Sequence, residues 1–166
     1  MMDEPEIKHF NIRVYGLIIK EKTKILLSDE FILDRKMTKY PGGGMRFGEG
    51  PADCIMREAI EEFGQGIEII EHFYTTHFFQ RALFYDDHQL ISIYYRLRFK
   101  EPPRFKISEK SFDFDEMANG NQSFRWADIA TLEENELSFP IDRYVLGLLK
   151  AHEHPDKVGG IPHRGG

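Results

Sequence analysis

The feature that most constrains this chain is a run of glycines directly before an acidic helix. Residues Tyr40–Ile69 read YPGGGMRFGEGPADCIMREAIEEFGQGIEI. A proline followed by three glycines disfavours a regular element, because proline lacks an amide proton and glycine lacks a Cβ. Pro51 suits the first turn of a helix, and Gly64 suits the position just after its end. We therefore expect a broken extended stretch over 37–47 and then a helix that starts at Pro51 and stops at Gly64.

The two faces of this helix differ in chemistry. At about 100° per residue, three glutamates lie within about 100° of one another, opposite an apolar stripe that we expect to pack on a sheet. The glutamates are Glu58, Glu61 and Glu62, and the stripe is Ala52, Ile55, Met56, Ala59, Ile60 and Phe63.

Like charges at this spacing destabilise a helix, by about a few tenths of a kcal/mol per pair. No lysine three or four positions away offsets the glutamates, and Arg57 lies on one flank of them. Converging carboxylates without cationic partners are typical of a site for a hard divalent cation such as Mg²⁺ or Mn²⁺. The neighbouring glycines would let the backbone approach the same place.

The segments around the helix alternate or are rich in β-branched and aromatic residues, which predicts strands. The expected strands are 10–20, 24–32, 67–79, 89–99 and 123–129, with a long surface loop before the last. A second helix is expected in FPIDRYVLGLLKAH, with Ile141, Tyr144, Val145, Leu148 and Leu149 on its apolar face. The chain has no internal repeat, so we expect one domain over 1–166 with a loose tail over 153–166.

Charge and length limit the classes of function. The chain has 166 residues, enough for one domain with a core, and a net charge of −6. An acidic chain is a poor general nucleic-acid binder, since such binding depends on a basic face. A small phosphorylated substrate is compatible with this charge, because a bound metal can supply positive charge locally.

The compartment is predicted from the single cysteine and from the start of the chain. Cys54 has no partner for an intramolecular disulfide, which favours a reducing compartment, and we expect it to pack rather than to bind metal. The acidic start MMDEPEIKHF differs from a secretory signal, and no apolar run approaches about 20 residues. We expect a cytoplasmic protein without a membrane segment.

The segment Gly43–Gln65 resembles the Nudix box, the signature of Nudix hydrolases. Its polar positions match the box at the family's spacing, namely Gly43, Glu49, Arg57, Glu58, Glu61, Glu62 and Gly64. Two apolar positions depart from it: Ala59 is small where a bulky aliphatic is usual, and Gln65 stands where an aliphatic is usual. We expect Ile67 to take over the second role.

The resemblance implies a fold and a reaction. The order of elements over about 10–151 is similar to the family's α+β fold, an α/β/α sandwich with a mixed central β-sheet flanked by helices. The implied Nudix hydrolase domain is about 8–152. Enzymes of this family use water to cleave a phosphoanhydride bond in a nucleoside diphosphate linked to another group. The implied cofactor is Mg²⁺ or Mn²⁺, and the implied partner is a small nucleotide.

The resemblance also implies roles for individual residues. Glu58, Arg57 and Glu61 are the implied catalytic residues, with Glu58 as the general base and Arg57 as a brace for the loop. Substrate contacts are expected from Gly43 and Arg46, with Tyr74 and Phe78 as candidate stacking rings. The implied metal ligands are the Gly42 carbonyl, Glu58, Glu61 and Glu62, with Glu49 and Glu116 as further candidates.

Several alternatives stay open at this level. Glu49 is either an outer metal ligand or the partner of Arg57, and the base could instead come from Asp113, Asp115 or Glu116 in the long loop. A non-catalytic nucleotide sensor is the main rival, although the box acids are intact and no winged helix fits in the chain. An isoprenyl diphosphate isomerase would need a cysteine placed differently from Cys54.

The substrate is also open. No proline lies between Gly66 and Lys100, unlike in ADP-ribose hydrolases, and Glu61 and Glu62 are both present, unlike in GDP-mannose hydrolases. A nucleoside triphosphate, ordinary or oxidised, and a nucleotide sugar remain. A homodimer is a further expectation, since strand edges and the long loop offer surfaces.

Overall fold

The computed structural model of the chain describes residues 4–153. Its strands are β1 (His9–Lys20), β2 (Lys24–Ile32), β3 (Arg35–Lys39), β4 (Gly42–Gly44), β5 (Ile67–Thr75), β6 (His88–Phe99), β7 (Ile107–Ser108) and β8 (Gln122–Asp128). Its helices are α1 (Pro51–Phe63), the 3-10 turn η1 (Glu134–Glu136) and α2 (Pro140–Glu153). The predicted loose tail begins at Glu153, which is the last residue of α2, and the rest of the tail lies outside the described residues.

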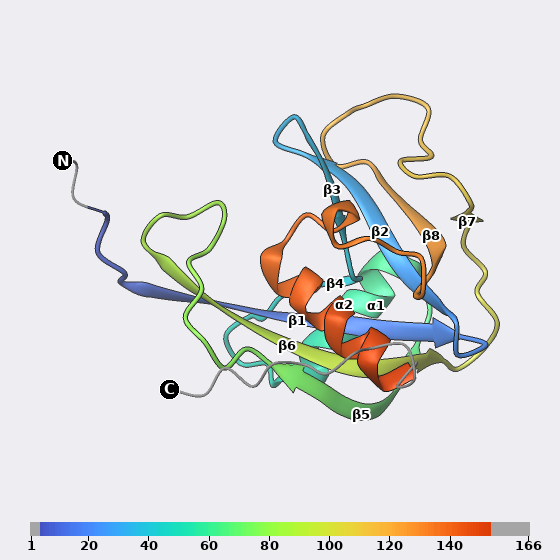
Figure 1. Ribbon diagram of the computed structural model, residues 1–166, viewed down its shortest axis with the longest axis horizontal. Helices are drawn as coiled ribbons and strands as arrows, with labels where there is room; N and C mark the ends of the chain where they lie inside the picture. The colour runs from blue at the N-terminus through green and yellow to red at the C-terminus, as the bar shows by residue number, and fades with distance from the viewer. Residues whose placement is uncertain (1–3, 154–166) are drawn as a thin grey trace.

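The sheet consists of two halves joined through β1 and β2. Strand β1 pairs in parallel with β6 over ten residues and antiparallel with β4, whereas it pairs with β2 only at Ile19–Ile25 and Lys20–Lys24, beside their hairpin. One half therefore contains β5, β6, β1 and β4, and the other contains β3, β2, β8 and β7 (Figure 1). Beyond the hairpin, β1 and β2 are unpaired with each other, which leaves room for a cleft.

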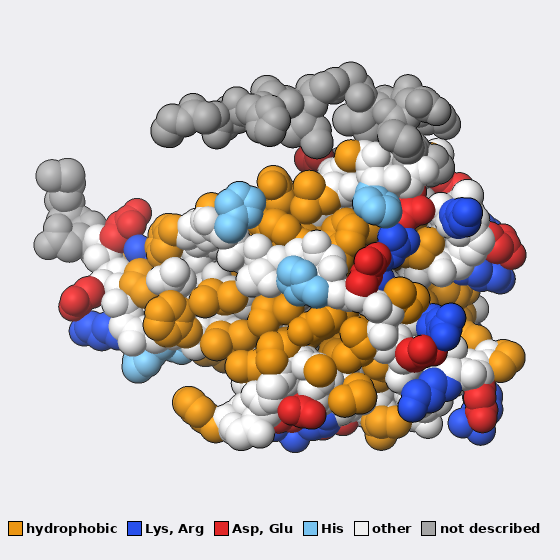
Figure 2. Space-filling view, turned by 90° about the horizontal axis from the view of Figure 1, so that it is seen from below, with side chains coloured by type: hydrophobic (Ala, Val, Ile, Leu, Met, Phe, Trp, Pro, Cys, Tyr) orange, Lys and Arg blue, Asp and Glu red, His pale blue; other side chains and the backbone are white. Residues whose placement is uncertain are grey.

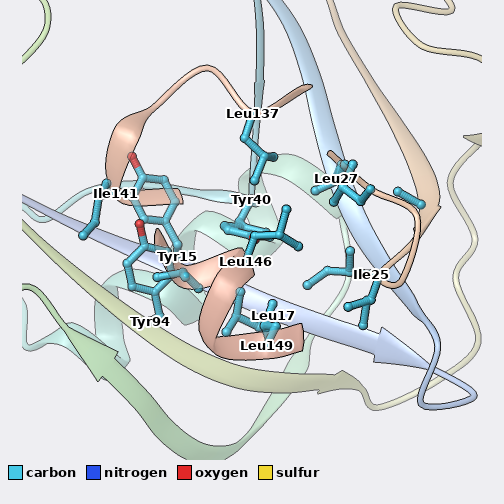
Figure 3. Close-up of a cluster of buried hydrophobic side chains, with 14 of the residues drawn as sticks. Tyr15, Leu17, Ile25, Leu27, Tyr40, Tyr94, Leu137, Ile141, Leu146 and Leu149 are labelled. Atoms are coloured by element: carbon cyan, nitrogen blue, oxygen red, sulfur yellow. The ribbon is translucent and has the colours of Figure 1, made fainter. Parts of the chain in front are cut away.

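The two helices cover opposite faces of the sheet (Figure 1). Side chains alternate along β1, so that Tyr15 and Leu17 pack with α2 while Val14 and Ile18 pack with α1. The α2 cluster in Figure 3 gathers Tyr15, Tyr40, Tyr94, Leu137, Leu146 and Leu149. The α1 cluster contains Cys54, Ile55, Ala59, Phe63, Leu97 and Phe124. The expected α/β/α sandwich with a mixed sheet is thus confirmed.

The prediction that the glycine run excludes a regular element was wrong. Gly42–Gly44 form β4, opposite Arg13–Tyr15 of β1, and Arg35–Lys39 form β3 opposite β2. Strand β4 can lie against β1 because Gly42 lacks a side chain. A Cβ on Gly42 would lie 2.1 Å from the Val14 carbonyl oxygen, and Gly42 has a φ of 140°, which other residues rarely adopt.

Helix α1 has the predicted bounds, and Gly64 ends it in a left-handed conformation with φ 66°. The predicted apolar stripe was partly wrong, since Met56 and Ile60 are 44% and 55% exposed while Cys54 is fully buried. The helix is rotated so that the side of Cys54, rather than that of Met56, faces the sheet.

Two further differences from the sequence expectations concern α2 and β5. On α2, Tyr144 is half-exposed, and the buried face is instead Ile141, Asp142, Val145, Leu146 and Leu149. Strand β5 ends at Thr75 rather than at residue 79.

Ile67 is buried in the α1 cluster as expected. The Gln65 side chain donates a hydrogen bond of 3.1 Å to the Glu101 carbonyl and accepts one of 2.8 Å from the Arg104 amide. Within residues 4–153, no helix is both long enough and apolar enough to cross a membrane.

Candidate active site

Two of the box glutamates lie in one row along α1 that faces the glycine strand. Cys54, Glu58 and Glu62 are four residues apart, which places them on one side of the helix. The Gly42 amide donates a hydrogen bond of 3.0 Å to Glu62 Oε2. A Cβ on Gly43 would lie 2.4 Å from Glu58 Oε1. The glycines therefore allow the backbone of β4 to approach both carboxylates.

Arg57 ties the helix to the loop between β4 and α1. Its guanidinium donates hydrogen bonds to Glu49, to Glu58 at 2.8 Å, to Glu61 at 3.2 Å and to the Gly44 carbonyl at 3.0 Å. The hydrogen bond from Arg57, together with one from the Arg46 amide, lowers the pKa of Glu49 to about 2. The structure thus shows Glu49 as the partner of Arg57, which is one of the two roles considered for it. The expectation that the helix glutamates lack cationic partners was wrong, because Arg57 pairs with Glu58 and Glu61.

A second cation, Lys39, lies on the other side of the glutamate row. Its Nζ is 3.0 Å from Glu30 Oε1 and donates a hydrogen bond of 2.9 Å to the Gly42 carbonyl, which was the predicted metal ligand. Burial lowers the pKa of Lys39, but the carboxylates of Glu30 and Glu62 outweigh this effect and raise it overall. Burial also raises the pKa of Glu62 to about 7, against the opposing effects of Lys39 and of a hydrogen bond from Gln122.

Two adjoining pockets lie between the two halves of the sheet. The first, which we call the carboxylate pocket, has a volume of about 340 Å³ and is lined by Arg13, Glu30, Ile32, Lys39, Gly42, Gly43, Gly44, Glu58, Glu62 and residues 120–122. The second, the apolar pocket, has a volume of about 360 Å³ and is lined mainly by Ile32, Leu33, Met37, Leu83, Phe84, Tyr85, Leu90 and Phe139, with Asn11 and Gln80. Arg13, Glu30, Ile32 and Lys39 line both pockets.

A family model described as the NUDIX domain matches residues 9–146, which include both pockets and the whole glutamate row. The chain belongs to the Nudix family. This match confirms the resemblance seen in Gly43–Gln65 and the class of enzyme that it implied, a Nudix hydrolase. Among curated protein sequences, none matches this chain.

Solved structures share the Nudix fold at low sequence identity. A NUDIX hydrolase from Nitrosomonas europaea is 16% identical, with 88% of this chain and 91% of that chain covered and a TM-score of 0.63. The MutT protein from Methanosarcina mazei Go1 is 17% identical, with coverage of 89% and 97% and a TM-score of 0.62. A UDP-X diphosphatase is 15% identical, with coverage of 90% and 67% and a TM-score of 0.59. At these identities the likeness concerns the fold alone.

The structure separates Glu61 from Glu58 and Glu62, the two Nudix box glutamates that line the carboxylate pocket. The Glu61 side chain is half-exposed and bonded to Arg57 and to Arg46, whose Nη2 donates to Glu61 Oε1 at 3.2 Å. Neither Glu61 nor Arg46 lines the carboxylate pocket. Glu61 therefore lies beside the site, in the same ion-pair network as Arg57.

The predicted stacking rings lie elsewhere on this Nudix fold. Tyr74 and Phe78 pack against Tyr144 of α2, with ring centroids 5.3 and 5.6 Å apart, and line neither pocket. The side of the molecule that carries β5 shows a broad area of hydrophobic side chains (Figure 2). The rings that do line the apolar pocket come from the loop after β5, including Phe84 and Tyr85, and from Phe139.

The acidic loop residues also lie apart from the Nudix box acids. Asp113, Asp115 and Glu116 line a third pocket of about 530 Å³, which shares Asn121 and Gln122 with the carboxylate pocket. Lys106 Nζ lies 3.0 Å from Asp113. Glu116 therefore does not join Glu58 and Glu62.

The sequence reasoning missed Arg13, Glu30 and Lys39. The available signal was weak: Arg13 is the one charged residue among residues 12–19, and Lys39 comes two residues before Pro41. Their convergence depends on β1 and β2 separating beyond the hairpin, which the local sequence does not predict.

Proposed function

We propose that the chain is a divalent-metal-dependent hydrolase of a nucleoside diphosphate linked to another group, cleaving a phosphoanhydride bond by water. The observation that carries the proposal is the arrangement of the two pockets. Glu58 and Glu62 line a pocket that adjoins an apolar one, and the cations Arg13 and Lys39 lie at the junction. A diphosphate suits the carboxylate pocket once a metal offsets its charge, and a nucleobase suits the apolar pocket.

The donor chemistry supports Mg²⁺ or Mn²⁺, as is general for Nudix hydrolases. Carboxylate oxygens are preferred by these hard cations, and Glu30, Glu58 and Glu62 line one pocket. Within residues 4–153, however, no three acidic, histidine or cysteine side chains are already gathered as a metal site. Metal binding therefore requires Glu58 to separate from Arg57, and Glu30 and the Gly42 carbonyl to separate from Lys39. Glu58 and Glu62 are the proposed ligands, with the Gly42 carbonyl and Glu61 beside them.

The bound metal would neutralise the diphosphate and lower the pKa of the attacking water. Glu58, on α1 beside Gly43 of β4, is the proposed general base that takes the proton from this water. Arg57 would hold Glu58 in place through the bond of 2.8 Å. Glu58 lines this pocket whereas Glu116 lines the third one, which favours Glu58 as the base, and a Glu116→Gln variant without turnover would reverse that choice.

Substrate, assembly and location are proposed in outline. Ordinary or oxidised nucleoside triphosphates and nucleotide sugars are the candidate substrates. The net charge of −6 favours such small nucleotides over nucleic acids. The homodimer and the cytoplasmic location stay predictions.

The test is a screen for phosphate or pyrophosphate release from nucleoside triphosphates, oxidised nucleotides, dinucleotides and nucleotide sugars. Each compound is incubated with Mg²⁺, with Mn²⁺ and with EDTA. Turnover of at least one compound that needs the metal is expected. Silence across the screen, with a nucleotide still raising the melting temperature, would favour the non-catalytic sensor instead.

A further inference from the structure

Arg13 lies at the junction of the two pockets. It stands on β1 directly opposite Gly44 of β4 and lines both pockets. A Cβ on Gly44 would lie 3.8 Å from Arg13 Nη1, which places this end of the guanidinium beside the glycine strand. The guanidinium therefore faces the passage through which a substrate spanning both pockets must run.

One neighbour fixes the orientation of this side chain. Arg13 Nε donates a hydrogen bond of 2.7 Å to the hydroxyl of Tyr15, whose ring is held in the α2 core. Tyr15 is buried and stacks on Tyr94 at a centroid distance of 5.3 Å. A guanidinium anchored through Nε is already ordered before a ligand arrives, which reduces the entropy lost on binding.

The other two nitrogens of Arg13 have no protein partner among residues 4–153. Neither Nη1 nor Nη2 donates a hydrogen bond there, and no carboxylate lies within 4.0 Å of them. The two other cations of the site differ in this respect, because Lys39 is paired with Glu30 and Arg57 with Glu49 and Glu58. A half-buried arginine with two unused donor groups is suited to an oxyanion from outside the protein.

We propose that Arg13 forms a phosphate subsite between the two pockets and binds the phosphate attached to the nucleoside. This inference rests on the proposed function and assigns the orientation of its substrate. The nucleoside occupies the apolar pocket, Nη1 and Nη2 of Arg13 bind two oxygens of its phosphate, and the next phosphate lies toward Glu58 and Glu62. Arg13 thus positions the phosphoanhydride bond and takes no part in the proton transfer.

The reverse orientation fits less well. The apolar pocket offers rings for a base and the amides of Asn11 and Gln80 for its polar edge. The carboxylate pocket has few apolar side chains, and its acids suit a metal-bound phosphate rather than a base.

The test compares nucleosides with their 5′-monophosphates by calorimetric titration in EDTA. The probes are adenosine, guanosine, cytidine and uridine with AMP, GMP, CMP and UMP, against wild type, Arg13→Gln and Arg13→Lys. Arg98→Gln is the matched control, since Arg98 is exposed on β6 and paired with Glu68. Melting curves verify that each variant is folded.

The wild type is expected to bind one monophosphate about tenfold to a hundredfold more tightly than its nucleoside. Arg13→Gln should abolish this increment while nucleoside affinity stays unchanged, and Arg98→Gln should keep it. Arg13→Lys should keep only part of it, because lysine lacks the planar fork. If Arg13→Gln does not fold, monophosphate binding by Arg13→Lys as tight as in wild type would overturn the proposal.

The proposal would also be overturned if folded Arg13→Gln still bound the monophosphate more tightly than the nucleoside, or if the wild type did not. The two proposals can fail separately. If the tighter binding of the monophosphate depends on Arg13 but the screen detects no turnover, the hydrolase proposal fails and the phosphate subsite stands. If the screen detects turnover but the tighter binding does not depend on Arg13, the phosphate subsite fails and the hydrolase proposal stands.

Discussion

Gly43 and Glu58 lie so close that any side chain on the first would displace the second. A Cβ on Gly43 would lie 2.4 Å from Glu58 Oε1 and 2.6 Å from its Cδ. Both atoms belong to the end of a flexible side chain, so the clash can be relieved by moving Glu58 rather than the backbone.

Gly43→Ala should therefore reduce turnover far more than stability. Displacing the proposed base by about 1 Å is expected to lower kcat about a hundredfold. The melting temperature should fall by only a few degrees. Steady-state kinetics and thermal melting measure the two effects.

Gly42→Ala supplies the contrast on the same strand. Its Cβ would meet backbone atoms of Val14 and Tyr15, at a φ of 140°, so the strand itself has to move. This variant should be strongly destabilised. Equally strong destabilisation of the two variants would contradict the conclusion that a side chain at Gly43 displaces Glu58 rather than the backbone.

Arg57→Lys should lower kcat about tenfold to a hundredfold, as is typical when a group that orients a site residue is lost. One ammonium group cannot bond Glu49, Glu58 and the Gly44 carbonyl at once, as the guanidinium does. The measurement is kcat at saturating substrate, with Arg98→Lys as the control. Wild-type kcat in folded Arg57→Lys would show that the loop needs no such brace.

Stability should depend on pH through Asp142. Burial raises the pKa of this carboxyl to about 7, against the hydrogen bond from Tyr94 and the charges of Lys39 and Arg13. Between about pH 4 and 7 the folded state then holds a proton that the unfolded state has released. The free energy of unfolding should fall with rising pH in this window, by up to about 1.4 kcal/mol per unit.

Asp142→Asn should reduce this dependence, because an amide does not titrate, and the slope that remains belongs to Glu62, whose pKa is also raised to about 7. Urea unfolding at a series of pH values from 4 to 8 measures the effect. An identical slope in wild type and variant would assign the pH dependence to other groups.

How far the sequence could predict this molecule depends on which interactions are local. The bounds of α1 follow from Pro51 and Gly64, which act within one turn, and these were predicted correctly. The rotation of α1 depends on its packing against β4, so the exposure of Met56 and Ile60 was not predicted. Arg13 was missed for the same reason, since its role arises only where β1 and β2 separate.

Mn²⁺ or Mg²⁺ should raise the melting temperature through Glu58 and Glu62. A ligand at a hundred times its Kd stabilises the folded state by about 2.7 kcal/mol. Thermal melting with metal and with EDTA is compared for wild type, Glu58→Gln and Glu62→Gln. Equal shifts in all three proteins would place the metal elsewhere.

The most direct measurement of the central claim is metal-dependent kcat, on the compound that the screen identifies, for Glu58→Gln, Glu62→Gln and the control Glu68→Gln. Glu68 lies on β5 and is bonded only to Arg98 among the described residues. We predict a loss of at least about a hundredfold for the first two variants and wild-type turnover for the control. Full turnover in both Glu58→Gln and Glu62→Gln would contradict the proposal that this glutamate row is the active site.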